Sequence, residues 1–211
     1  MPYIGDSITV EAGVALSVLR TEFWARGYDY LSQDAAGIAR TDRWLNQSHA
    51  SIVLKELWPF RLTTTSGAAP LSIANVGKVL SVIDSDNNDW DLTEMTEREM
   101  TPYRLTSLGI PYFYYRDGLT LRLWPSSTHT ISVRFYARPA KLVNDADTTM
   151  IPERFMDVLI DDAVIRGGKD ADNAQVVALA RQERDQGLAD MREDLMVAPR
   201  HIQRSGYHED G

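Results

Sequence analysis

Acidic residues gather in one short stretch, DSDNNDWDLTEM, which runs from Asp84 to Met95. Oxygen ligands at the first, third and fifth positions of such a loop are typical of a calcium site. The position of the turn glycine, however, holds Asp89, and the position of the bidentate glutamate holds Met95. The stretch therefore predicts a solvated hairpin turn, with a calcium loop as the weaker alternative.

The same carboxylates offer a second chemistry, because glycoside hydrolases place two carboxyl groups on either side of the scissile bond. Asp84 with Asp91 or Glu94 could form such a pair. Paired carboxylates are common on surfaces, and the sequence predicts no aromatic-lined cleft around them. A carbohydrate-active enzyme or carbohydrate-binding protein is therefore the alternative function.

Other catalytic groups have no supporting pattern. His49, His129, His201 and His208 lack the spacing of a zinc site, and His49 lies on the inward side of a predicted helix, which favours a hydrogen-bonded structural histidine. The chain has no cysteine and no G-x-S-x-G nucleophile elbow. We expect no enzymatic activity and no cofactor.

Composition limits the partners. The formal net charge of -8 over 211 residues argues against a protein that grips phosphate backbones, so contact with DNA should be transient and non-specific. No apolar run approaches the roughly 20 residues that cross a bilayer, and the N-terminus MPYIGDSITV lacks the features of a secretory signal. We expect no membrane contact and synthesis in the cytoplasm.

Helical periodicity marks both ends of the chain. It predicts four helices, over residues 14–26, 33–58, 152–167 and 171–196. Gly27 should end the first helix, Ser32 should cap the second, and Pro59 should end the second at Trp58. Gly167 and Gly168 should break the third.

The last helix has two arginines within an otherwise apolar strip. Its members are Val177, Arg181, Arg184, Leu188, Met191 and Leu195. A mixed strip of this kind predicts a face for a partner.

The middle of the chain, from about 60 to 138, consists of short β-favouring runs separated by turn residues. In YFYYRDGLTLRLWP, Asp117-Gly118 predicts a type I′ hairpin turn. Leu119, Leu121 and Leu123 alternate with polar residues, whereas the preceding strand has aromatic side chains on both faces. Aromatic surface on both faces predicts an interface with another subunit or a tail protein, formed by Tyr112, Tyr114, Tyr115, Asp117, Gly118 and Trp124.

The order of helices, strands and helices predicts an α+β fold in a single domain over residues 1–211. The N- and C-terminal helices should pack as a bundle, with an inserted antiparallel β lobe. Trp58 and Phe60 should form the core that fixes the angle between them. An extended C-terminal tail, residues 198–211, has only Ile202 and Tyr207 to bury.

Four segments together resemble the head-to-tail adaptor, or connector, family of tailed bacteriophages. They are LWPF at the end of the second helix, GIPYFYYRDGLTLRLWPSS, TISVRFYARPAKLVNDADTTMIPERFMDVLIDDAVIRGG, and the long charged helix that follows. The resemblance covers roughly residues 10 to 196. Its most specific part runs from Gly109 to Gly168 and includes Y-x-R-P and a D-x-D before IP.

The resemblance implies a structural protein of the virion neck, made in the host cytoplasm. Twelve subunits would form a ring around the channel for the genome, with the portal above and tail or nozzle proteins below. It suggests that the tail lies against the portal, and the mixed strip of the last helix offers a second portal-binding surface. The residues assigned to the portal are Arg200, His201, Ile202, Arg204, Tyr207, Arg181, Arg184 and Leu188.

Overall fold

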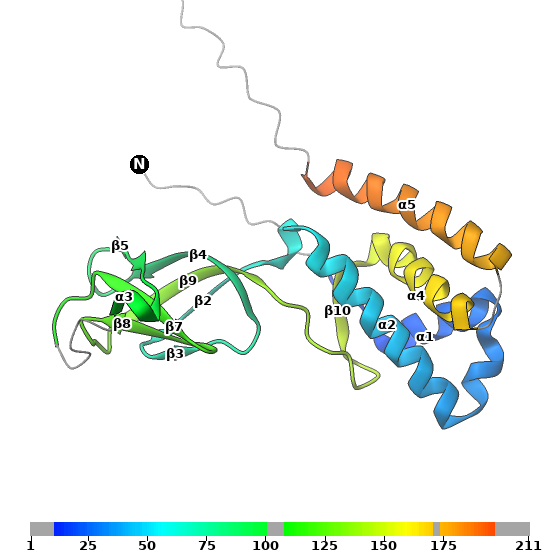
Figure 1. The fold of residues 1–211 in the computed structure, drawn as a ribbon, viewed down its shortest axis with the longest axis horizontal. Helices are drawn as coiled ribbons and strands as arrows, with labels where there is room; N and C mark the ends of the chain where they lie inside the picture. Colours follow the sequence, from blue (N-terminus) through cyan, green and yellow to red (C-terminus); the bar gives the residue numbers. More distant parts are fainter. Residues whose placement is uncertain (1–10, 101–107, 171–173, 197–211) are drawn as a thin grey trace, which may run out of the picture.

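The computed structural model describes residues 11–100, 108–170 and 174–196, and it consists of a helical bundle and a β lobe placed end to end (Figure 1). The main helices of the bundle are α1 (Leu16–Phe23), α2 (Ala35–Lys55), α4 (Met156–Asp170) and α5 (Ala174–Met196). All strands between β2 and β9 belong to the lobe, which is inserted between α2 and α4. The predicted α+β class, with an inserted β lobe, is confirmed.

The first helix begins later than predicted, because the chain enters the bundle as a strand. β1 (Gly13–Ala15) pairs with β10 (Thr148–Pro152), and a Cβ on Gly13 would collide with the carbonyl oxygen of Thr149. The N–H groups of Leu16 and Ser17 then donate to the carbonyl groups of Asp147 and Asp145. These contacts satisfy two of the donors that the first turn of a helix leaves open.

The connection from α1 to α2 turns at Gly27, as predicted. It consists of η1 (Trp24–Tyr28) and η2 (Asp29–Gln33), and Gly27 has a φ of +97°, which favours glycine. The cap of α2 is Asp34, whose carboxylate accepts from the N–H of Gly37, so the prediction of Ser32 was wrong. Ser32 instead donates to the carbonyl of Asp29 at 2.6 Å.

The third helix, predicted over residues 152–167, is α4, which begins and ends later in the chain than predicted. Pro152 ends β10, a short turn η4 (Glu153–Phe155) follows, and α4 continues to Asp170. Gly167 and Gly168 do not break it. A Cβ on Gly167 would lie 3.2 to 3.3 Å from the rings of Trp44 and Phe23, so the glycine allows two aromatic side chains to pack against the helix.

α4 is the central helix of the bundle. It packs against α2 and α1 as well as against α5, and residues 158–165 are all buried. Because α4 lies between them, the outer faces of α2 and α5 look in different directions.

The lobe contains two four-stranded sheets, where one sheet was expected. Their strand orders are β2-β9-β4-β5 and β3-β8-β7-β6. The strands are β2 (Leu62–Ala68), β3 (Leu71–Ser72), β4 (Val76–Asp84), β5 (Trp90–Asp91), β6 (Thr93–Glu94), β7 (Phe113–Asp117), β8 (Thr120–Trp124) and β9 (Thr130–Ala137). All pairings within these sheets are antiparallel except β6 with β7. Buried residues of both sheets form one apolar cluster, so the lobe is a small sandwich with a short helix, α3 (Glu97–Met100), at its side.

The hairpin between β7 and β8 forms one residue later than predicted. Asp117 pairs with Thr120, so Gly118 and Leu119 are the two turn residues. Only Gly118 has a positive φ, +62°, which fits a type II′ turn, with glycine first, rather than type I′. Leu121 and Leu123 are buried, as the alternation predicted, but the prediction was wrong for Leu119, which is 53% exposed in the turn.

Candidate functional site

The joint between the bundle and the lobe is built around a buried arginine. Arg61 is the last residue of the short turn η3 (Pro59–Arg61) and is only 4% exposed. Its Nη1 donates to the carbonyl groups of Val53 at 3.0 Å and Glu56 at 2.6 Å, and its Nε donates to the carbonyl of Ala137 at 3.0 Å. One side chain therefore binds both the end of α2 and the end of β9, and burial lowers the pKa of its guanidinium.

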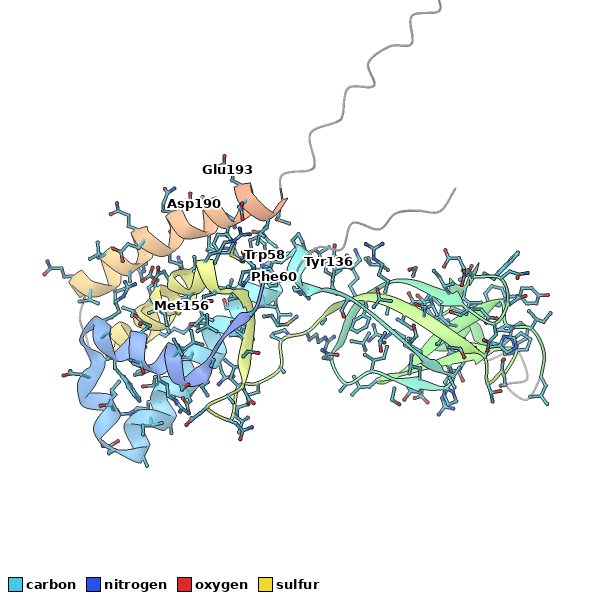
Figure 2. All side chains as sticks on the ribbon, turned by 180° about the vertical axis from the view of Figure 1, so that it is seen from behind. Trp58, Phe60, Tyr136, Met156, Asp190 and Glu193 are labelled. Carbon is cyan, nitrogen blue, oxygen red and sulfur yellow. The ribbon has the colours of Figure 1, made fainter. Side chains whose placement is uncertain are left out.

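Three aromatic side chains, Trp58, Phe60 and Tyr136, lie at the joint (Figure 2). Trp58 is fully buried, its ring stacks on Phe60 with centroids 6.0 Å apart, and its Nε1 donates to the carbonyl of Ile52 at 2.8 Å. The guanidinium of Arg61 lies 5.9 Å from the ring centre of Tyr136. The predicted aromatic core at the joint is confirmed, but α2 ends at Lys55 and not at Trp58, because Arg61 binds its last carbonyl groups.

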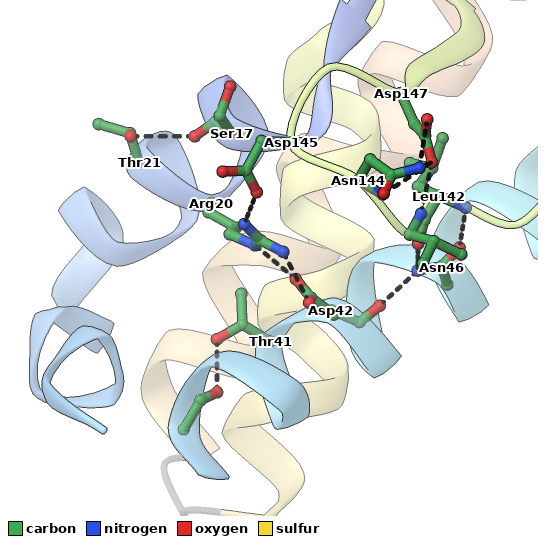
Figure 3. Close-up of polar contacts among 12 residues, drawn as sticks. Ser17, Arg20, Thr21, Thr41, Asp42, Asn46, Leu142, Asn144, Asp145 and Asp147 are labelled. Atoms are coloured by element: carbon green, nitrogen blue, oxygen red, sulfur yellow. Dashed lines mark hydrogen bonds and ion pairs between the residues drawn. The ribbon is translucent and has the colours of Figure 1, made fainter. Parts of the chain in front are cut away.

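A second set of contacts fastens the returning chain to the bundle (Figure 3). The side-chain amide of Asn46 donates to the carbonyl of Leu142 at 2.9 Å and accepts from its N–H at 2.7 Å. Arg20 binds both carboxylate oxygens of Asp42, at 2.6 and 2.8 Å, and also binds Asp145. The chain that leaves β9 is thus held by α1 and α2 together.

The D-x-D motif of the sequence has a structural role in this loop. Asp145 supplies the partner of Arg20, and the carboxylate of Asp147 accepts from the N–H groups of Val143 at 2.7 Å and Asn144 at 2.8 Å. The backbone bond to Asn144, followed by that to Val143, lowers the pKa of Asp147. Neither carboxylate has a catalytic geometry.

His49 has the structural role predicted for it. It is 1% exposed, and its Nε2 accepts a hydrogen bond from the N–H of Met150 at 3.1 Å. Burial lowers the pKa of His49 to about 4. Its neutral ring therefore connects α2 to β10.

The acidic stretch forms a turn whose first carboxylate is buried. Asp84 is fully buried, lies 2.8 Å from Nδ1 of His129, and accepts from the N–H of Asp86 at 3.2 Å. Asn88 and Asp89 form the turn with φ values of 51° and 54°. Within residues 11–100, 108–170 and 174–196, no three histidine or acidic side chains are grouped as metal ligands.

This burial argues against the alternative of a glycosidase pair. Asp91 and Glu94 are exposed on β5 and β6, whereas Asp84 points into the lobe and is bound to His129. A carboxylate without solvent access cannot protonate a sugar oxygen. Asp84 is better described as a structural residue.

The predicted aromatic interface was wrong for one of its members. Tyr114 is 4% exposed and belongs to the core of the lobe, and burial raises the pKa of its hydroxyl. Tyr112 is 51% exposed, and Tyr115 and Trp124 are half-buried.

Sequence reasoning missed Leu108, which is 87% exposed in the segment before β7. Large apolar side chains alternate at Leu108, Ile110 and Tyr112, and this pattern could have indicated the exposed apolar surface. All three side chains are exposed.

The mixed strip of α5 faces its own bundle. Val177, Leu188 and Met191 are buried, and Arg184 binds Asp162 at 3.1 Å and Asp185 at 2.7 Å. Leu188 is therefore not available to the portal on the folded subunit, which corrects that part of the prediction.

Of the residues assigned to the portal, Arg181 is exposed. The other residues assigned to the portal, Arg200, His201, Ile202, Arg204 and Tyr207, lie outside the described residues.

A cluster of charges joins η1, α4 and α5 on another side of the bundle. Arg26 binds Asp157 at 2.9 Å, Asp161 at 3.2 Å and Glu183 at 3.6 Å. Asp161 is the buried member, and burial raises its pKa to about 6, although Arg26 opposes that shift. The arrangement stabilises helix packing and has no nucleophile beside it.

These observations describe an α+β protein in which a bundle and a lobe are joined by buried contacts. The family model of the SU10 adaptor protein matches residues 16–204, so the chain belongs to this family of bacteriophage head-to-tail adaptors. The resemblance drawn from the sequence is confirmed at that level. No curated protein matches the chain. In the part of the chain that the structure describes, every helix is too short or too polar to cross a membrane.

Proposed function

We propose that this chain is a structural protein of the phage neck, which forms a ring, of twelve subunits, between portal and tail. The observation that carries this proposal is the family match, because it spans both the bundle and the lobe. A match to the whole two-part subunit supports an adaptor role more strongly than a match to one part would.

The charge of the chain supports a role as a lining for the genome channel. Twelve copies with a net charge of -8 would carry about -96, a field that repels a DNA rod. DNA would therefore pass without lasting contact, and the subunit needs no site that reads or holds it. The virion neck is the location that follows, with synthesis in the host cytoplasm.

The two ends of the subunit are assigned to different partners. The C-terminal tail, with Arg200, His201, Ile202, Arg204 and Tyr207, is proposed to bind the portal, where its cations and one aromatic anchor suit an otherwise acidic chain. The surface that includes the exposed Tyr112 and the half-buried Tyr115 and Trp124 is proposed to contact a neighbouring subunit or the tail protein. Large exposed apolar side chains at one end of the lobe favour this assignment.

The test is the mass of the native particle, measured by light scattering after size exclusion, with and without the portal protein of the same phage. A ring, alone or on the portal, is the expected result. Deletion of residues 198–211 should leave the melting temperature unchanged and abolish attachment to portal. A compact monomer in both mixtures, with measurable affinity for oligosaccharides, would overturn the proposal in favour of the carbohydrate alternative.

A further inference from the structure

The outer face of α5 is acidic. Its exposed carboxylates, here called the acidic face, are Glu183, Asp185, Asp190, Glu193 and Asp194. Arg26, Arg184 and Arg154 of the same subunit pair with the first, second and last of these. Asp190 instead accepts from the neutral amide of Gln186 at 2.8 Å, and Figure 2 shows Asp190 and Glu193 on the outer side of the helix.

The outer face of α2 is basic. Arg40 and Arg43 are exposed one turn apart, and Lys141 is exposed on the segment that follows β9. We call these three residues the basic face. Of the carboxylates on and beside α2, Asp42 is bound to Arg20 and Glu56 is bound to Arg192 at 2.6 Å.

The two faces lie on opposite edges of the bundle. In Figure 1, α5 runs along the upper edge, whereas the first half of α2 and the loop between β9 and β10 form the lower edge. A contact between unlike patches of identical subunits is heterologous, and such contacts close into rings when the rotation allows it. A symmetric contact between two acidic faces would instead place like charges together, which costs binding energy.

An apolar groove accompanies the basic face. It has a volume of about 660 Å³ and lies between α2 and residues 139–143, with Arg43 and Lys141 among its lining. Ala39, Ala50 and Val143 contribute apolar surface to it. On the opposite edge, α5 exposes Leu179, a side chain that is 58% accessible. Apolar contact inside a charged rim is the usual anatomy of a specific interface.

We infer that the acidic face of α5 in one subunit docks on the basic face and groove of α2 in the next copy. This inference rests on the proposed ring and assigns its subunit contact to named residues. The occupant of each face is a second copy of this chain, chosen because its opposite edge supplies the complementary charge.

The experiment exchanges charge between the faces in the full-length chain. Variant A carries Arg40→Glu and Arg43→Glu, so both of its faces are acidic. Variant B carries Asp190→Lys and Glu193→Lys, so the carboxylates left on its acidic face are the three that pair with arginines of the same subunit, and the two lysines make that face basic as well. Each variant alone should assemble at least tenfold less well than the unmodified chain, by the concentration at which half of the subunits are in rings.

An equal mixture of A and B should recover the rings. In an alternating ring, each acidic face would again meet a basic one, and recovery requires that both variants are folded. A matched control reverses two exposed cations of the lobe, Lys78→Glu and Arg134→Glu, and should assemble normally.

The outcomes separate this inference from the proposed function. If the unmodified chain forms rings and A and B also do so alone, the ring stands and the assigned faces are wrong. If A and B fail alone and also fail together, charge pairing between these faces is wrong. If the unmodified chain stays monomeric with and without portal, the ring itself is overturned and the inference falls with it.

Discussion

The bundle and the lobe use polar side chains in different ways. In the bundle, arginines reach carboxylates from distant parts of the chain, as Arg154 does with Asp194 at 2.6 Å and Arg20 with Asp42 at 2.6 Å. In the lobe, the long contacts are backbone ladders, with β9 paired to β2 on one side and to β4 on the other. The bundle is therefore sensitive to the charge state of its side chains, and the lobe depends more on strand pairing.

The apolar cores of the two regions also differ in size. Among the described residues, 24 buried hydrophobic side chains form the core of the bundle and 12 form that of the lobe. A small core leaves little surplus free energy over the entropy of ordering the chain. We therefore expect the lobe to be the less stable region, supported by its joint with the bundle.

The largest expected effect comes from truncating the core of the lobe. Phe135 on β9 is 2% exposed, and Phe135→Ala should cost about 3 to 5 kcal/mol. Because the core of the lobe is small, this loss should melt the lobe in a separate transition at lower temperature, while the helical circular dichroism persists. Differential scanning calorimetry and far-ultraviolet dichroism measure the two transitions.

The matched variant in the bundle is Leu159→Ala, on the buried face of α4. It should cost about 2 to 5 kcal/mol and lower the transition of the helices. One shared transition in both variants would show that the two regions unfold as a single unit, which contradicts the comparison.

The next effect concerns the joint. Arg61→Met keeps much of the side-chain volume but leaves the carbonyl groups of Val53, Glu56 and Ala137 without their donor. The expected loss is about 3 kcal/mol, since unpaired buried polar groups cost roughly 1 to 3 kcal/mol each and water can reach some of them. Urea denaturation measures it. Arg134→Met, at an exposed position of β9, is the control and should change stability by no more than about 0.5 kcal/mol.

The fold class followed from the order of periodic segments, but several boundaries depended on tertiary contacts. Gly167 and Gly168 have poor helix propensity, yet both lie inside α4, where Phe23 and Trp44 pack against Gly167. Nothing in the local pattern of α2 predicts that the side chain of Arg61 would bind its last carbonyl groups.

The candidate interaction residues show the same limit. The alternation correctly predicted the burial of Leu121 and Leu123, because one face of a sheet is a local property, but it failed for Leu119, which the shifted turn exposes. The outgoing strand was ambiguous, since a run of aromatics does not indicate which face the second sheet covers. Tyr114 was therefore assigned to an interface although it lies in the core.

A smaller effect tests the pH sensitivity of the bundle. The pKa of His49 is about 4 in the folded state, compared with an ordinary value of 6.5. Its contribution to stability is present above pH 6.5 and is lost as the pH falls toward 4, by about 2 to 3 kcal/mol. His49→Gln, whose amide oxygen can accept from Met150, should remove this acid loss. Stability curves in urea at several pH values between 4 and 7 measure it, and an unchanged slope would contradict it.

The smallest expected effect is that of Asp161, and it has the opposite sign. Burial raises its pKa to about 6 from an ordinary 3.8, and the charges of Glu183 and Asp157 add to the shift. Its contribution to stability is therefore fully present below pH 3.8 and is lost as the pH rises through about 6. The pKa of Asp161 moves from 3.8 to about 6, a smaller displacement than that of His49 from 6.5 to about 4, so the change in stability should also be smaller.

The opposite signs make the two residues separable in one series of variants. With His49→Gln alone, the remaining slope should show stability falling as the pH rises from 4 to 7, because Asp161 then ionises in a buried position. Adding Asp161→Asn, which keeps the shape and removes the titration, should flatten that slope. If the double variant still loses stability with rising pH, a group other than Asp161 titrates, and the assignment of this pH dependence to Asp161 is wrong.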